Sequence, residues 1–196
     1  MKILTDIILW LKRSLTALFL CKKSAKRQEY REYIQEHKEN VMRAWKVMQE
    51  RCKDEYFICD DWKFFHLDAW VKRHDDSKYS REEFEAYRRW FSPTKREKKR
   101  KERYAAKFQE ALSHHYENNP HHWQYWIGKP TKGYMGCLEK TLFHVEMVLD
   151  WTAMGYKFGD TALQYYKKHK GEIQISPDKV EFVERLLLKM DGGESA

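Results

Sequence analysis

Apolar residues recur at every third or fourth position along most of the chain, which is the spacing of one face of an α-helix. One such stripe begins at Tyr30 and predicts a helix of roughly 25 residues. Because His37 belongs to this stripe, its imidazole is expected to face the protein core. The full stripe consists of Tyr30, Ile34, His37, Val41, Ala44 and Met48.

The same periodicity predicts further helices that are separated by start and stop signals. A second helix is expected over residues 60–74, and His74 lies on its apolar face. Ser80 and Glu83 have the spacing of a capping box, which predicts the start of a third helix. The dipeptide Ser92-Pro93 stops that helix, because proline cannot continue the backbone hydrogen bonding.

Three to four more helices are expected in the C-terminal half. One carries His115 on its apolar stripe and ends at Asn118-Asn119-Pro120. A long helix around residues 138–154 places Glu146 and Asp150 one turn apart on the same face. Two last helices are expected to start at Asp160 and at Ser176-Pro177.

The overall pattern predicts an all-α fold. The 196 residues show no alternation of strands and helices, and 8 Gly and 4 Pro are too few for a Gly-rich β architecture. The 8 Trp, 12 Tyr and 10 Phe provide large side chains for a core. We expect one helical domain over residues 29–191, an N-terminal helix over residues 1–28 and a short disordered tail over residues 192–196.

Residues 1–28 predict an amphipathic basic helix. Asp6, Lys12 and Arg13 interrupt the apolar sequence, so no stretch approaches the roughly 18 apolar residues that a membrane span needs. The helix either packs its apolar stripe on protein or lies in an anionic membrane interface. That stripe consists of Leu4, Ile8, Leu11, Leu15 and Leu18.

The formal net charge of +8 is concentrated in two blocks. Residues 1–31 hold eight Lys or Arg against two acids, and residues 95–103 hold seven against two. A nucleic-acid binder more often carries basic residues over a whole face, so nucleic acid is the less favoured partner. The second block is interpreted as a solvated helix or loop.

The residues that could carry chemistry are mainly histidines. The P-loop, G-x-G-x-x-G, G-x-S-x-G and H-E-x-x-H motifs are absent. His37, His74 and His115 each occupy the apolar stripe of a different predicted helix, where an unpaired imidazole is costly. A shared divalent metal explains several buried histidines, because imidazole and carboxylate are the ligands that such metals accept.

The order of these groups along the chain resembles the H…HD…D pattern of the HD-domain metal-dependent phosphohydrolase superfamily. Its dinuclear branch inserts further histidines between the HD pair and the last Asp. Lys78 matches the HDxxK form of the motif. The pattern in this chain is His37, His74-Asp75, His115, His121-His122 and Asp150.

Three longer segments resemble, more specifically, a family of uncharacterised bacterial and phage proteins. The recurring blocks of that family are HDxSKfs, NPHHWxYW and EMxxDW. The matching segments here are HDDSKYSREEFEAYRRWF, HHYENNPHHWQYW and EMVLDWTAM. This closer resemblance covers about residues 30–190 and implies no established activity.

The HD resemblance implies an HD-like helical bundle and a role for each residue. His37, His74, Asp75 and Asp150 would bind a first metal ion, and Asp75 would bridge to a second ion. Lys78 would orient the attacking water or a phosphate oxygen, and Glu146 would support a ligating imidazole. His114 is distinguished from His115 only by the helical stripe. The second ion would be held by His115, His121 and His122.

These roles lead to the expectation of a metal-dependent phosphohydrolase, either a phosphomonoesterase or a phosphodiesterase. Its substrate would be a nucleotide or a similar phosphate ester, attacked by a water molecule that one or two ions of Mn, Fe, Co, Zn or Mg activate. The alternative is a non-catalytic helical binding protein with a structural or vestigial metal site, which uses its basic segments to bind membrane or nucleic acid.

Cysteine usage favours a cytoplasmic location. Cys21, Cys52, Cys59 and Cys137 form no CxxC pair, which indicates free thiols in a reducing compartment. Peripheral contact with the inner face of the membrane, through residues 1–28, is the alternative that the amphipathic stripe leaves open.

Overall fold

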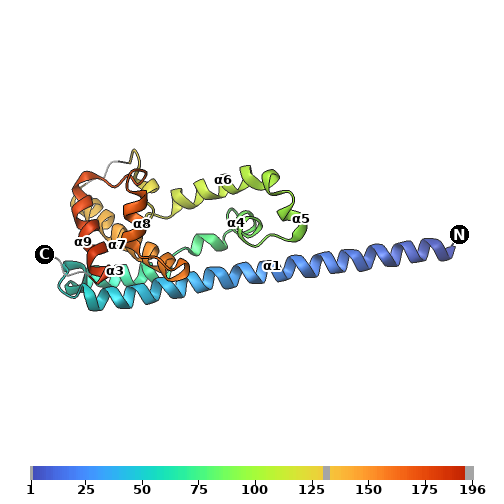
Figure 1. Ribbon diagram of the computed structural model, residues 1–196, viewed down its shortest axis with the longest axis horizontal. Helices are drawn as coiled ribbons and strands as arrows, with labels where there is room; N and C mark the ends of the chain where they lie inside the picture. Colours follow the sequence, from blue (N-terminus) through green and yellow to red (C-terminus); the bar gives the residue numbers. More distant parts are fainter. Residues whose placement is uncertain (1, 130–132, 193–196) are drawn as a thin grey trace. The chain divides into compact units, whose positions relative to one another are not determined.

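The computed structural model describes residues 2–129 and 133–192. Every regular element in these two ranges is helical, without a strand, which confirms the all-α prediction (Figure 1). In chain order, the elements are α1 (Lys2–Arg51), α2 (Tyr56–Cys59), α3 (Asp61–Lys72), the 3-10 helix η1 (Asp76–Tyr79), α4 (Phe84–Phe91), α5 (Lys95–Lys98), α6 (Lys101–Asn118), the 3-10 helix η2 (Trp123–Trp126), α7 (Gly133–Phe158), α8 (Ala162–His169) and α9 (Pro177–Asp191).

Helix α1 runs without a break through residue 28, where a separate N-terminal helix was expected to end. The sequence from Lys2 to Arg51 contains no Gly or Pro, so nothing in it interrupts the backbone hydrogen bonding. The apolar stripe predicted on residues 4–18 lies outside the described side chains, and residues 193–196 of the predicted tail lie outside the described chain. Among the described helices, none has both the length and the apolar character that a bilayer crossing requires.

Several other predicted boundaries agree closely with the structure, but the helix start predicted by the Ser80–Glu83 capping box is wrong, because α4 begins at Phe84 after the N-cap residue Glu83. Ser92 caps the C-terminus of α4, α6 ends at Asn118, and Ser176 precedes α9 with Pro177 in its first turn. The start predicted at Asp160 is wrong by two residues. Helix α8 begins after Thr161, because this residue and Gln164 form the capping box.

The chain divides into two compact units, and α1 and α6 contribute to both. The first unit consists of residues 1–34 and 78–112. Trp90 and Phe108 stack in it with ring centroids 4.4 Å apart. Its buried core residues are Tyr30, Ile34, Tyr87, Phe108 and Ala111.

The basic block at residues 95–103 belongs to the first unit, and its Lys and Arg side chains are all exposed, as a solvated segment requires. One of the two acids within it, Glu97, turns inward to the fully buried Arg88. The two side chains form a two-pronged ion pair, with N–O distances of 2.8 and 2.7 Å. This hydrogen bonding from Arg88 lowers the pKa of Glu97 to about 2.

The second unit consists of residues 35–77 and 113–196. Within it, α7 packs against α3, α8 and α9 (Figure 1). Its core is built from large apolar side chains, among them Trp45, Met48, Leu67, Val71, Leu142, Val148, Leu149, Leu186 and Leu187. The predicted domain limits at residues 28 and 192 stay predictions. All seven predicted metal ligands lie in this second unit.

Candidate metal centre

The predicted ligands reach one place from five separate parts of the second unit. Three of them come from helices: His37 from α1, His115 from α6 and Asp150 from α7. The other ligands lie where helices end. His74 and Asp75 directly follow α3, and His121 and His122 lie between Pro120 and η2.

A first cluster consists of His37, His74 and Asp150. The Nε2 atom of His37 lies 3.2 Å from Nε2 of His74 and 3.1 Å from Oδ1 of Asp150. The distance from His74 Nε2 to the same carboxylate oxygen is 3.7 Å. Two ligands of one ion at bond lengths of about 2.0–2.2 Å are about 2.8–3.6 Å apart in octahedral or tetrahedral geometry. The spacing of the first cluster therefore fits a single cation.

A second cluster consists of Asp75, His115, His121 and His122. Its ligand atoms all lie within 4.8 Å of one another. Nε2 of His115 is 3.3 Å from Oδ1 of Asp75 and 2.8 Å from Nε2 of His122. Nε2 of His121 is 3.6 Å from the same Asp75 oxygen. These are again distances at which the side chains can share one ion.

Asp75 connects the two clusters. Its Oδ1 faces His115 and His121, whereas its Oδ2 lies 3.4 Å from His37 Nε2 and 3.6 Å from His74 Nε2. The backbone of Asp75 has φ = 59°, the one positive value among the described residues other than glycine. Such a conformation costs energy for most residues, and Asp tolerates it better than most. It turns the carboxylate of Asp75 between the two clusters.

Glu146 contacts one imidazole ring of each cluster. This buried carboxylate lies 2.9 Å from Nδ1 of His74 and 3.6 Å from Nδ1 of His121. Because a carboxylate only accepts hydrogen bonds, the Nδ1 proton of His74 points to Glu146. In the neutral ring, the Nε2 lone pair of His74 then faces His37, Asp75 and Asp150, as metal binding requires.

His115 is held by two polar residues that the sequence did not indicate. Its Nδ1 lies 3.1 Å from the hydroxyl of Ser77, and the Asn119 amide donates to that hydroxyl and to the His115 carbonyl. We interpreted Asn119 only as part of a helix stop. Its contact with Ser77 joins residues 42 positions apart, so no local pattern could have indicated it.

The carboxylates make the first cluster a favourable place for positive charge. Burial alone lowers the pKa of His74, but the charge of Asp75 and the hydrogen bonds to Asp150 and Glu146 outweigh it and raise the pKa to about 10. The pKa of His37 is raised in the same way, against the effect of burial, by Asp150 and Asp75. Burial also opposes ionisation of Asp150, yet hydrogen bonds from His37 and His74 keep its pKa well below the usual value.

The histidines of the second cluster behave differently. Burial, followed by the charge of His74, holds the pKa of His121 well below its ordinary value. Burial and the neighbouring His121 and His115 do the same for the pKa of His122. His121 Nε2 is buried and has no hydrogen-bond partner within the described part of the chain. A neutral imidazole with an unsatisfied buried nitrogen is the state in which histidine binds a metal ion.

Two further predictions concern the neighbours of these residues. Of the adjacent pair on α6, the structure places His115 in the second cluster, whereas the His114 carbonyl accepts a hydrogen bond from Asn118. Lys78 belongs to the first compact unit, where its Nζ lies 5.9 Å from the centre of the Tyr87 ring. Its role toward a phosphate therefore stays a prediction.

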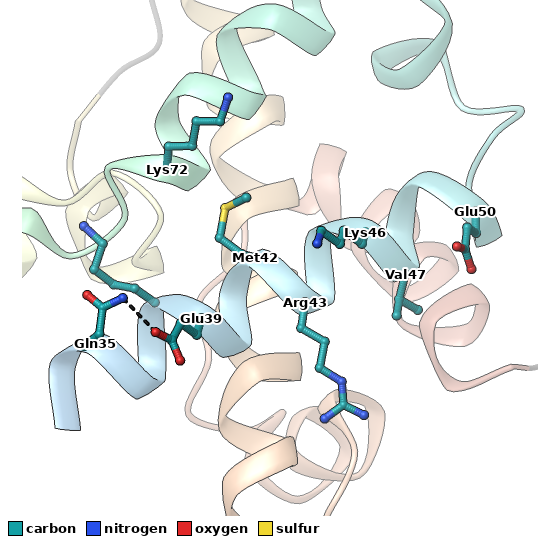
Figure 2. A pocket seen from close by; sticks show the side chains of 9 residues that line it. Gln35, Glu39, Met42, Arg43, Lys46, Val47, Glu50 and Lys72 are labelled. Atoms are coloured by element: carbon teal, nitrogen blue, oxygen red, sulfur yellow. Dashed lines mark hydrogen bonds between the residues drawn. The ribbon is translucent and has the colours of Figure 1, made fainter. Parts of the chain in front are cut away.

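The second unit also has a surface groove, of about 550 Å³, along α1 and beside Lys72 of α3 (Figure 2). It is lined by residues 35–50 of α1 on the side that faces solvent, opposite His37. Two of its charged side chains already have partners: Lys38 pairs with Asp76, and Lys72 pairs with Asp68. The groove therefore offers no chemistry comparable to the histidine clusters.

Comparison with known proteins identifies a family for the chain. The family model described as "Family of unknown function (DUF5662)" matches residues 26–189, and the chain therefore belongs to this family. No curated protein and no solved structure matches the chain.

Proposed function

We propose that this member of the DUF5662 family is a metal-dependent phosphohydrolase that cleaves a phosphomonoester or phosphodiester bond. The observation that carries the proposal is the position of Asp75, which presents one carboxylate oxygen to each of two adjacent clusters. Two divalent ions held side by side activate a water molecule and stabilise the attacking and leaving oxygens of an in-line displacement. No side chain needs to act as a nucleophile in such a reaction.

The types of ligand indicate which metals fit. The two clusters together offer five imidazoles and two aspartates. Nitrogen-rich sites of this kind favour Mn, Fe, Co or Zn, whereas Mg prefers oxygen ligands and keeps more of its water. We therefore propose one or two transition-metal ions, with His37, His74 and Asp150 around one ion and His115, His121 and His122 around the other. Asp75 would contact both.

The order and the helical origin of these residues also support the proposed relation to HD domains. His37 lies on α1, the pair His74-Asp75 follows α3, and Asp150 lies on α7, which is the chain order of the H…HD…D pattern. Lys78 lies three residues after Asp75. We propose that its ammonium group orients a phosphate oxygen, which a compact cation suits.

The exposure of the clusters supports catalysis over a purely structural metal site. The side chain of Asp150 is 13% exposed, whereas those of His74 and Asp75 are 0% and 2% exposed. In the second cluster, His122 is the member that is not fully buried. Water and a small substrate would therefore reach the centre on one side, whereas a structural metal site is normally closed by protein ligands.

The test uses the full-length protein, reconstituted separately with Mn, Fe, Co, Zn and Mg. Nucleotides and cyclic dinucleotides are screened for phosphate release, and metal content is measured in the same samples. His115→Ala should lose metal and turnover, and the matched variant His114→Ala should keep both. Metal binding without turnover on any of these substrates would favour the structural site, and equal behaviour of the two variants would contradict the assignment of His115.

A further inference from the structure

The centre is most open where two of its members approach the surface. Asp150 is the most exposed residue of the first cluster, and His122 is the most exposed residue of the second. A substrate phosphate that contacts both clusters would enter past these two residues. The groups bonded to that phosphate would then lie against the residues that flank Asp150 and His122.

Next to Asp150, this flank is aromatic. Trp151 follows Asp150 on α7, and its ring centroid lies 5.5 Å from that of Tyr165 on α8. Helix α8 packs directly against α7, and this packing holds Tyr165 beside α7. His169, one turn later on α8, lies 4.8 Å from the Tyr165 ring.

The Tyr165 side chain remains partly accessible to solvent. It is 37% exposed, whereas its neighbour Tyr166 is buried at 4%. Partial burial raises the pKa of the Tyr165 hydroxyl, and the charge of Asp150 raises it further. The phenol therefore lies close enough to the first cluster to feel the charge of its carboxylate.

A second tyrosine flanks the other cluster. The ring centroid of Tyr116, on α6, lies 5.1 Å from that of His122. The hydroxyl groups of Tyr116 and Tyr165 also influence each other electrostatically. One tyrosine thus packs beside His122 of the second cluster, and the other packs on Trp151, the residue that follows Asp150 of the first cluster.

We propose that Tyr165, together with Tyr116, forms a binding site for a planar aromatic group on the substrate, such as the base of a nucleotide. The inference rests on the proposed function, because it assigns a binding site to the part of a phosphate ester that does not react. An exposed phenol ring is a suitable platform, since aromatic rings bind planar groups by offset stacking at little entropic cost. Tyr165 is a binding residue in this proposal and takes no part in bond cleavage.

The experiment compares two ligands that differ only in the base. They are the phosphonate analogue of adenosine 5′-monophosphate, in which CH₂ replaces the bridging oxygen, and the corresponding phosphonate of ribose. Neither can be hydrolysed at that position, so binding to the metal-loaded, full-length protein is measured by calorimetry without turnover. Stacking of one base on an aromatic side chain changes affinity by roughly 5- to 150-fold.

Three variants complete the design. Tyr165→Leu removes the ring, Tyr165→Phe keeps it, and Tyr56→Leu removes a tyrosine of similar exposure, 38%, elsewhere in the second unit. The wild type, Tyr165→Phe and Tyr56→Leu should bind the adenosine phosphonate at least about fivefold more tightly than the ribose phosphonate. Tyr165→Leu should bind the two ligands almost equally, with unchanged affinity for the ribose phosphonate.

The inference is overturned if the wild type does not distinguish the two ligands, binds neither of them, or keeps its preference after Tyr165→Leu. An equal loss of affinity for both ligands in Tyr165→Leu would also overturn it, because that result indicates a damaged centre. Selective binding of the adenosine phosphonate without hydrolysis of any phosphate ester would support this site and contradict the proposed hydrolase activity. The two proposals can therefore fail separately.

Discussion

Glu146→Gln tests how the buried carboxylate next to His74 and His121 supports metal binding. Glu146 is 3% exposed, and its Oε1 accepts the Nδ1 proton of His74 at 2.9 Å. The glutamine amide keeps the size of the side chain. It removes the negative charge that orients the His74 ring and makes the Nε2 atom of His74 a stronger metal ligand. Loss of such a supporting contact lowers metal affinity about 10- to 100-fold, which corresponds to about 1.4–2.8 kcal/mol. A single hydrogen bond to a charged group is worth about 1.5–3 kcal/mol, so the two estimates agree.

The assay is a metal titration in competition with a chelator of known affinity, performed on the full-length protein. Glu139→Gln is the matched control, because Glu139 lies on the same helix two turns earlier and is exposed. Glu146→Gln should bind the same number of ions with weaker affinity, and Glu139→Gln should equal the wild type. An unchanged affinity in Glu146→Gln would refute the supporting role. The loss of one whole ion at saturating metal would instead make Glu146 a direct ligand.

Three further predictions address other parts of the chain. Lys78→Ala should keep the full metal content and lower turnover per bound metal by about 100-fold or more, and equal turnover at equal metal content would contradict its role. Glu97 has a folded pKa of about 2, below its ordinary value of 4.5, so it should stabilise the fold fully above pH 4.5 by up to about 3 kcal/mol. That contribution should disappear as the pH falls toward 2, and Glu97→Gln should flatten the pH dependence of unfolding in this window. Removal of residues 1–28 should leave the metal-to-protein ratio unchanged, since every predicted ligand lies between His37 and Asp150. Sedimentation of the intact protein with anionic vesicles, reduced by salt, would assign that segment to a membrane surface, whereas aggregation of the truncated protein without vesicle binding would assign it to packing on protein.

The helical periodicity was sufficient to predict much of the fold and the direction of several side chains. His37, His74 and His115 were placed on apolar stripes, and all three are buried. The stripe also distinguished His115 from its neighbour His114. Such predictions succeed because a helix fixes the direction of each side chain relative to the next turn, independently of the rest of the fold.

Other features depend on contacts that local sequence does not encode. A helix end is expected at residue 28, yet α1 continues because no Gly or Pro there interrupts the helix. The contact between Ser77 and Asn119, and that between Glu146 and His121, join segments distant in sequence. The positive φ of Asp75 is set by the turn that follows α3, and the HD pair alone does not indicate it.

The central claim is that Asp75 is shared by two metal ions, and metal stoichiometry tests it most directly. Full-length wild type and Asp75→Asn are saturated with Mn or Zn, freed of excess metal and analysed for metal per chain by mass spectrometry. Asn keeps the side-chain size and tolerates the positive φ of this position, so the backbone is least disturbed. The account predicts two ions per wild-type chain and fewer than one in Asp75→Asn, without loss of helical content. A wild-type chain that retains one ion or none, or a variant that retains as much metal as the wild type, would contradict it.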